Sequence, residues 1–67
     1  MKEYYIFVRE NIHSGWYLDA TIWQNENDAV EAAYQIMADS DPLTISLAMS
    51  EDGSFPKLFR TLNQDKA

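Results

Sequence analysis

The hydrophobic pattern of this chain changes its period twice within 67 residues. Apolar side chains alternate with polar ones near both ends, and in the middle they recur at helical spacing. A period of two belongs to a strand with two different faces, and a period of about 3.6 belongs to a helix with one apolar side. The pattern therefore predicts two strands, one helix and two further strands, in that order.

The first two strands are predicted to form a hairpin. Residues 3–9 contain a run of tyrosine, isoleucine, phenylalanine and valine that is typical of a strand. Turn-forming residues follow at 11–15, and residues 16–23 predict a second strand that pairs antiparallel with the first. One face of this second strand is expected to carry Trp16, Leu18, Ala20 and Ile22, and the other face Tyr17, Asp19, Thr21 and Trp23.

The central segment, residues 28–38, is rich in helix-forming residues. Asn25 or Asn27 can cap this helix, because a short side-chain oxygen accepts a free backbone N–H of the first turn. Pro42 disfavours helical geometry at the residue before it, so we expect the helix to end at Asp39 or Ser40. The apolar stripe of the helix consists of Ala29, Val30, Ala33, Ile36 and Met37.

The last part of the chain predicts a second hairpin. Residues 43–50 alternate, and Gly53 suits a turn over residues 51–54 because it tolerates a positive φ. Residues 55–62 predict a fourth strand, in which Pro56 indicates an edge position or a late start. Residues 63–67 are expected to be a frayed tail. The apolar face of the third strand consists of Leu43, Ile45, Leu47 and Met49.

These elements predict a single α+β domain over residues 1–67, with the order ββαββ. A four-stranded antiparallel sheet with one helix packed on one face is the simplest such arrangement, and it leaves the other sheet face open. A chain this short buries only about 60% of its unfolded surface. Its core therefore depends on large aromatic side chains, of which there are three Phe, four Tyr and two Trp.

The sequence lacks the residues that several kinds of functional site require. Without cysteine there are no disulfides and no thiolate metal sites, and His13 is the only histidine. His13 next to Ser14 does not make a catalytic triad, and so small a domain has little room for an active-site cleft. No segment approaches the roughly 20 apolar residues that span a membrane. We expect a cytoplasmic protein that is not an enzyme and holds no metal or cofactor.

Charge is distributed unevenly along the chain, whose net charge is −6. Between Arg9 and Lys57 there is no lysine or arginine, and this stretch contains nine acids. Nucleic-acid-binding proteins carry basic surfaces, so direct binding to DNA or RNA is not expected. The natural complement of such a chain is a protein with a basic groove.

Part of this acidity is predicted to align on the helix. Asp28, Glu31 and Asp39, with Gln35, fall at helical spacing and form a polar stripe about 16 Å long. Such a stripe can imitate the phosphates of a nucleic acid in a basic groove, or it can be an ordinary solvated face. The candidate partner-binding residues are Asp28, Glu31, Asp39 and Asp41, supported by Glu26, Glu51 and Asp52.

A second candidate surface is the open face of the sheet. The first two strands carry large residues on both faces, so some of them must lie on the face that the helix leaves open. Aromatic residues dominate the binding energy of protein interfaces, and they also stabilise sheets by packing across strands. The candidates for this interface are Tyr5, Phe7, Tyr17 and Trp23.

In size, charge, missing cysteine and ββαββ order, the chain resembles small acidic phage-encoded inhibitors, namely anti-CRISPR proteins and DNA mimics. The resemblance covers the whole chain and involves no diagnostic motif. It implies a CRISPR effector subunit as the partner, in the cytoplasm of the phage host, and a mechanism that blocks DNA binding. The alternative is an interaction module, antitoxin-like or homodimeric, that uses the aromatic open sheet face.

Overall fold

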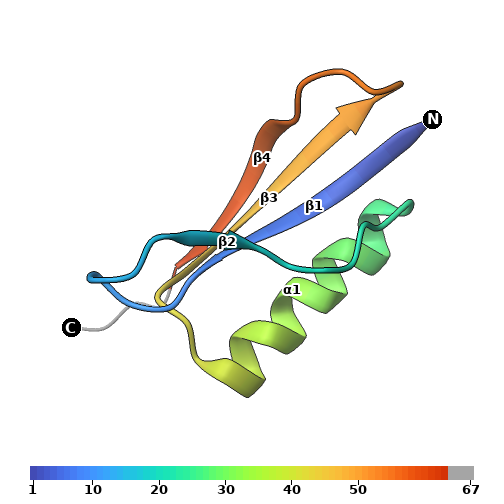
Figure 1. Cartoon of the computed structure of the whole chain (residues 1–67). Coiled ribbons are helices and arrows are strands. Elements are labelled where there is room, and N and C mark those ends of the chain that lie inside the picture. The colour runs from blue at the N-terminus through green and yellow to red at the C-terminus, as the bar shows by residue number, and fades with distance from the viewer. Residues whose placement is uncertain (64–67) are drawn as a thin grey trace.

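The computed structural model describes residues 1–63, which form one four-stranded antiparallel sheet and one helix (Figure 1). The order along the chain is ββαββ, and the order across the sheet is β2-β1-β3-β4. The predicted α+β fold is confirmed. The elements are β1 (Lys2–Arg9), β2 (Trp16–Leu18), α1 (Glu26–Ser40), β3 (Thr44–Glu51) and β4 (Lys57–Asn63).

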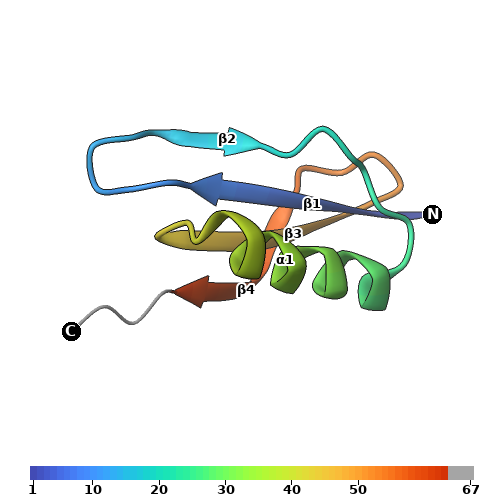
Figure 2. The same cartoon turned by 90° about the horizontal axis from the view of Figure 1, so that it is seen from below.

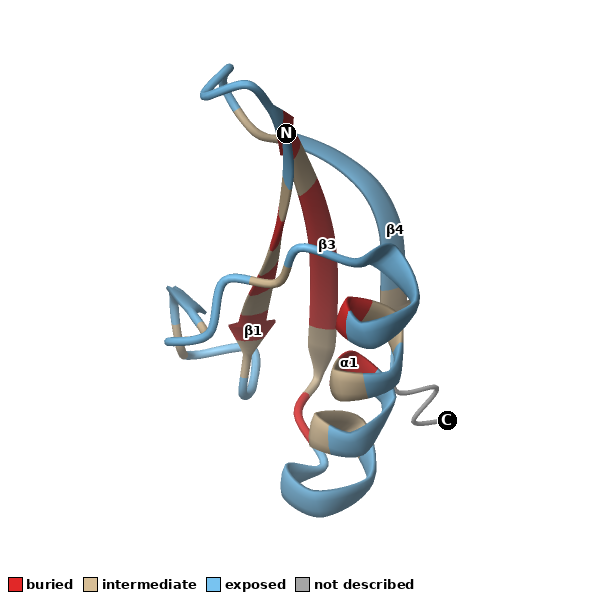
Figure 3. Cartoon of the chain, turned by 90° about the vertical axis from the view of Figure 1, so that its right-hand side faces the viewer, coloured by how far each residue is buried: buried red, intermediate tan, exposed pale blue. Residues whose placement is uncertain are grey.

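The core lies between α1 and the two central strands, β1 and β3 (Figures 2 and 3). Cross-strand partners point to the same face of a sheet, so the register of β1 against β3 identifies the covered face. That face carries the pairs Tyr4–Met49, Ile6–Leu47 and Val8–Ile45. On α1, Ala29 and Ala33 are fully buried, and their small side chains allow the helix to lie close to the sheet.

Both helix ends agree with the local sequence. The Oδ1 atom of Asn25 accepts a hydrogen bond from the backbone N–H of Asp28 at 3.2 Å, so Asn25 is the N-cap. The helix ends at Ser40, and Asp41 follows in a left-handed conformation with φ of 48°. The residue before a proline avoids helical geometry, and Pro42 occupies the next position.

The second strand is shorter than the predicted segment 16–23. Trp16, Tyr17 and Leu18 pair with Arg9, Val8 and Phe7, and the regular pairing stops there. An isolated bridge joins Trp23 to Tyr4, where an unbroken register would place Thr21. Two extra residues therefore lie in this stretch. Asp19 accepts a hydrogen bond from the N–H of Thr21 through Oδ2 at 3.3 Å, and such a local turn competes with strand pairing.

The fourth strand starts late and lies at the sheet edge, as Pro56 indicated. Phe55 precedes it and is 88% exposed, which corrects the predicted start at residue 55. The register shifts by one residue between Leu47 and Ala48, which leaves Phe59 as the extra residue of a β-bulge. The strand extends to Asn63, so that residue is not part of a tail, and residues 64–67 of the predicted tail lie outside the described residues.

The open face has a central strip of small side chains. Ser46, Ala48 and Ser50 of β3 lie there and are buried, although no helix covers them. Larger residues on the neighbouring strands shield this strip from solvent, because strands in a sheet lie only about 4.8 Å apart. The larger residues are Tyr5, Phe7, Trp16, Leu18 and Leu58.

Candidate functional site: an acidic helix flank beside Trp23

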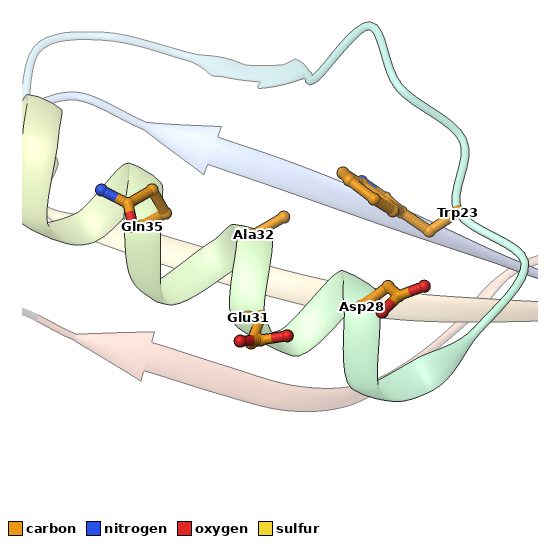
Figure 4. Close-up of a pocket in the computed structure, with 5 residues that line it drawn as sticks. All are labelled: Trp23, Asp28, Glu31, Ala32 and Gln35. Carbon is orange, nitrogen blue, oxygen red and sulfur yellow. The ribbon is translucent and has the colours of Figure 1, made fainter.

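Part of the polar stripe of α1 lies next to Trp23, in the segment that follows β2. We call Asp28, Glu31, Gln35 and Asp39 the acidic flank; all four are exposed. Three of them, Asp28, Glu31 and Gln35, border a pocket together with Trp23 (Figure 4). The predicted stripe is therefore not only a solvated helix face, because the aromatic side chain of Trp23 lies next to it.

No positive charge neutralises this flank within residues 1–63. The carboxylates of Asp28 and Glu31 have no hydrogen bond and no ion pair there. Asp39 accepts two hydrogen bonds from the amide Nε2 of Gln35, at 3.1 and 3.2 Å, and this neutral amide brings no positive charge to the flank. A flank of this kind attracts cations from outside the chain.

The basic residues of the described chain are engaged or placed elsewhere. Arg9 donates to two carbonyl oxygens of the β1–β2 loop, those of Ser14 at 3.1 Å and Ile12 at 2.9 Å. Lys57 and Arg60 lie on β4, which α1 does not contact. Within residues 1–63, none of the lysine or arginine side chains forms an ion pair with the acidic flank.

The other predicted acidic residues lie at the ends of the molecule. Glu26 is the first residue of α1 and Asp41 follows its last, so both extend the flank along the helix axis. Glu51 and Asp52 belong to the β3–β4 turn, and the start of β1 separates this turn from α1 (Figures 1 and 2). The carboxylate of Asp52 also pairs with the N-terminal amino group. The structure does not bring Glu51 and Asp52 into the flank.

The pocket beside the flank has a volume of about 290 Å³. Trp23 forms its wall, and Figure 4 shows the indole extending over α1 towards Ala32. Two backbone hydrogen bonds to Tyr4, of 2.7 and 2.9 Å, fix the position of Trp23 against β1. Its Nε1 is shielded from solvent and is the only buried side-chain polar atom in residues 1–63 without a hydrogen-bond partner.

The four aromatic candidates divide between the two faces. Tyr5 and Phe7 lie on the open face, whereas Tyr17 pairs with Val8 and Trp23 with Tyr4, which places both on the helix side. The open face also has a groove of about 310 Å³ lined by Phe7, Trp16, Ser46 and Leu58. Trp16 and Leu58 were not among the candidates. Large residues occur on both faces of these strands, so their alternation alone could not show which face the helix covers.

Tyr17 makes a specific polar contact at the edge of the sheet. Its hydroxyl donates to Oε1 of Glu10 at 2.8 Å. This hydrogen bond, together with desolvation and the nearby negative charges of Glu10 and Asp19, raises the pKa of Tyr17 above its usual value. The hydroxyl stays protonated at neutral pH, so Tyr17 adds no charge to this side of the molecule.

Residues 1–63 contain neither a cluster of potential metal ligands nor a helix that could cross a membrane. In the described part of the chain, no three His, Asp or Glu side chains gather as metal ligands. The helix α1 is too short and too polar to cross a bilayer, and residues 1–63 contain no other helix. No protein-family model matches the chain, and neither curated proteins nor solved structures yielded a match.

Proposed function

We propose that this protein is a non-catalytic inhibitor that binds a basic, nucleic-acid-binding surface of a protein partner through the acidic flank of α1. The proposed partner is a CRISPR effector, and the proposed effect is to prevent that effector from binding DNA. The proposal includes a phage origin and action in the cytoplasm of the host. One observation carries it: Asp28, Glu31 and Asp39 are exposed on one rigid helix, and no lysine or arginine of residues 1–63 pairs with them.

The spacing of these carboxylates supports the proposal. At about 1.5 Å per residue, Glu31 lies roughly 4.5 Å along the helix from Asp28 and about 12 Å from Asp39. Nucleic-acid-binding grooves hold lysine and arginine side chains at comparable intervals, because they follow a backbone with phosphates every few ångströms. A helix keeps its carboxylates in place without further ordering, which lowers the entropic cost of binding.

The direct test is competition with DNA. Purified CRISPR effector complexes of several types would be mixed with target DNA and increasing amounts of this protein, and DNA binding would be measured by mobility shift. We expect at least one effector to lose DNA binding. The inhibition should weaken steeply with salt, since exposed ion pairs are screened.

Charge reversal locates the interface. Asp28→Lys with Glu31→Lys should abolish inhibition, whereas Glu3→Lys with Glu10→Lys changes the net charge equally and should leave most of it. An equal loss in both variants would show that only bulk charge matters. Full inhibition by the first variant would contradict the proposal.

A second candidate function uses the groove on the open sheet face. Trp16 is 48% and Leu58 is 65% exposed at this groove, and large exposed apolar side chains in one place are typical of protein interfaces. The partner would be a cognate protein, as for an antitoxin, or a second copy of the chain. Leu58→Lys separates the two candidates: it should abolish self-association measured by light scattering across a concentration series, while it leaves the acidic flank intact and should leave the inhibition of DNA binding unchanged.

A further inference from the structure

The pocket between Trp23 and the acidic flank has a lining of unusual composition. Its wall is the indole of Trp23, its floor is the small side chain of Ala32, and its rim consists of Asp28, Glu31 and Gln35 (Figure 4). A volume of about 290 Å³ lies at the lower end of the range for small-molecule sites. It is of a size for one large side chain of a partner.

The rim presents hydrogen-bond acceptors and almost no donors. Asp28 and Glu31 contribute carboxylates with no partner in residues 1–63. Gln35 donates its Nε2 hydrogens to Asp39, which leaves Oε1 as the atom it can offer to a ligand. The one other side-chain donor, Nε1 of Trp23, is closed to solvent. A ligand that fits this rim must supply the donors.

The indole of Trp23 further restricts which hydrogen-bond donor group of a ligand fits the pocket. The face of an indole ring attracts cations, and it does so more strongly than the ring of tyrosine or phenylalanine. A guanidinium is flat, stacks on aromatic rings and presents five donors in a planar fork, whereas an ammonium is compact and strongly hydrated. Asp28 and Glu31 line the same pocket as Trp23, and the carboxylate of Asp28 is the one drawn nearer the indole in Figure 4.

We infer that this pocket binds one arginine side chain of the partner, with its guanidinium stacked on Trp23 and donating to Asp28 and Glu31. The inference rests on the proposed function, because it names the residue type that the acidic flank would recognise on a basic surface. The partner must then present both a positive charge and a flat group that can stack on Trp23. A lysine side chain supplies the charge, but its ammonium group cannot stack on an aromatic ring in this way.

The test uses a small probe in place of the partner. Acetyl-arginine amide would be titrated into the ¹⁵N-labelled protein, and the indole N–H signals of its two tryptophans would be followed by NMR. We expect a saturable shift of the Trp23 signal and little change at Trp16, which lies on the opposite sheet face and serves as an internal control. The neutral isostere Nα-acetyl-citrulline amide should produce no saturable shift. Nα-acetyl-lysine amide, whose side-chain ammonium is charged, should bind more weakly than the arginine probe.

Two variants test the shape and the charge of the pocket separately. Ala32→Leu fills the floor without changing any charge and should weaken arginine binding by about tenfold or more. Ala38→Leu, at an exposed position of the same helix, is the matched control and should bind as the parent does. Asp28→Asn with Glu31→Gln preserves the shape and should also lose binding. This pair keeps the test decisive if Ala32→Leu disturbs the fold.

The outcomes distinguish the inference from the proposed function. Equal shifts with arginine and citrulline, or equal shifts at Trp16 and Trp23, would overturn the arginine pocket. Binding of lysine as tight as that of arginine would overturn the choice of a guanidinium. If Ala32→Leu still inhibits an effector as the parent does, the pocket inference fails and the proposed function stands. If arginine binds the pocket but no effector is inhibited, the proposed function fails and the site remains.

Discussion

Tyr17 shows how a single side chain links the hairpin loop to the strands. Its hydroxyl reaches Oε1 of Glu10, seven residues earlier in the chain, across the β1–β2 loop. The hydrogen bond is made by the protonated hydroxyl, and a tyrosinate at this position would face the carboxylates of Glu10 and Asp19. Both effects favour the protonated form of Tyr17 in the folded protein.

The raised pKa of Tyr17 predicts how stability changes with pH. The folded chain holds this proton more tightly than the unfolded chain, so the stabilisation is fully present below the usual tyrosine pKa of about 10. It is lost as the pH rises through the higher folded pKa. Glu10→Gln should lower the pKa of Tyr17 towards its usual value. An ultraviolet titration of the parent and of this variant, each against its Tyr17→Phe counterpart, measures the difference. Identical Tyr17 titrations would contradict the assignment.

At the scale of elements, the β3–β4 turn depends on an unusual backbone. Asp52 has a φ of 52° and Gly53 a φ of 78°, and the N–H of Ser54 donates to the carbonyl of Glu51 at 3.0 Å. Two consecutive residues with positive φ are typical of the hairpin turn that matches the twist of its strands, and Asp-Gly is a preferred pair there. Gly53 was predicted for this role from its position in the sequence.

The two glycines of the chain form a matched pair for testing this turn. Gly53→Ala should lower the free energy of unfolding by about 1–2 kcal/mol, because a Cβ is disfavoured in the left-handed region. Gly15 has no positive φ and open space around its Cα. Gly15→Ala should therefore be neutral or stabilise by up to about 1 kcal/mol, through the unfolded state. Urea denaturation measures both, and equal effects would refute the turn argument.

At the scale of the whole described molecule, residues 1–63, the acidic flank of α1 has no cationic partner. The acidic flank and its extensions at Glu26 and Asp41 lie along α1, while Lys57 and Arg60 lie on an edge strand that the helix does not contact. With a net charge of −6, the carboxylates of Asp28, Glu31 and Asp39 on α1 repel one another, and no lysine or arginine of residues 1–63 pairs with them. This repulsion should lower the stability of the free protein.

Salt should therefore stabilise the free protein while it weakens binding to a basic partner. Raising NaCl to about 1 M, where the Debye length is near 3 Å, should increase the free energy of unfolding by about 1 kcal/mol or less. The neutral variant with Asp28→Asn, Glu31→Gln and Asp39→Asn should show a clearly smaller increase. Urea denaturation at low and high salt measures this, and an equal salt response in both proteins would show that repulsion on α1 is negligible.

The fold was predictable because most of its signals are local. Asn25 caps α1 through an atom only three residues from its donor, and Pro42 ends the helix through its own neighbour. The limits of β2 were not predictable in the same way. The segment 19–22 continues the alternating pattern of a strand. However, the side chain of Asp19 accepts a hydrogen bond within a local turn, and two extra residues interrupt the pairing between β2 and β1. Periodicity reports which side a residue faces and does not report whether its backbone is paired.

The sequence by itself determined the order of elements, the apolar side of the helix and the alignment of Asp28, Glu31 and Asp39, because each follows from residues close together in the chain. Only the tertiary structure decided which sheet face the helix covers, and with it the place of Trp23. The covered face depends on β1 pairing with β3, residues far apart in sequence. The sequence made Trp23 a candidate for the open sheet face. In the structure Trp23 pairs with Tyr4 on the helix side and lines the pocket beside the acidic flank.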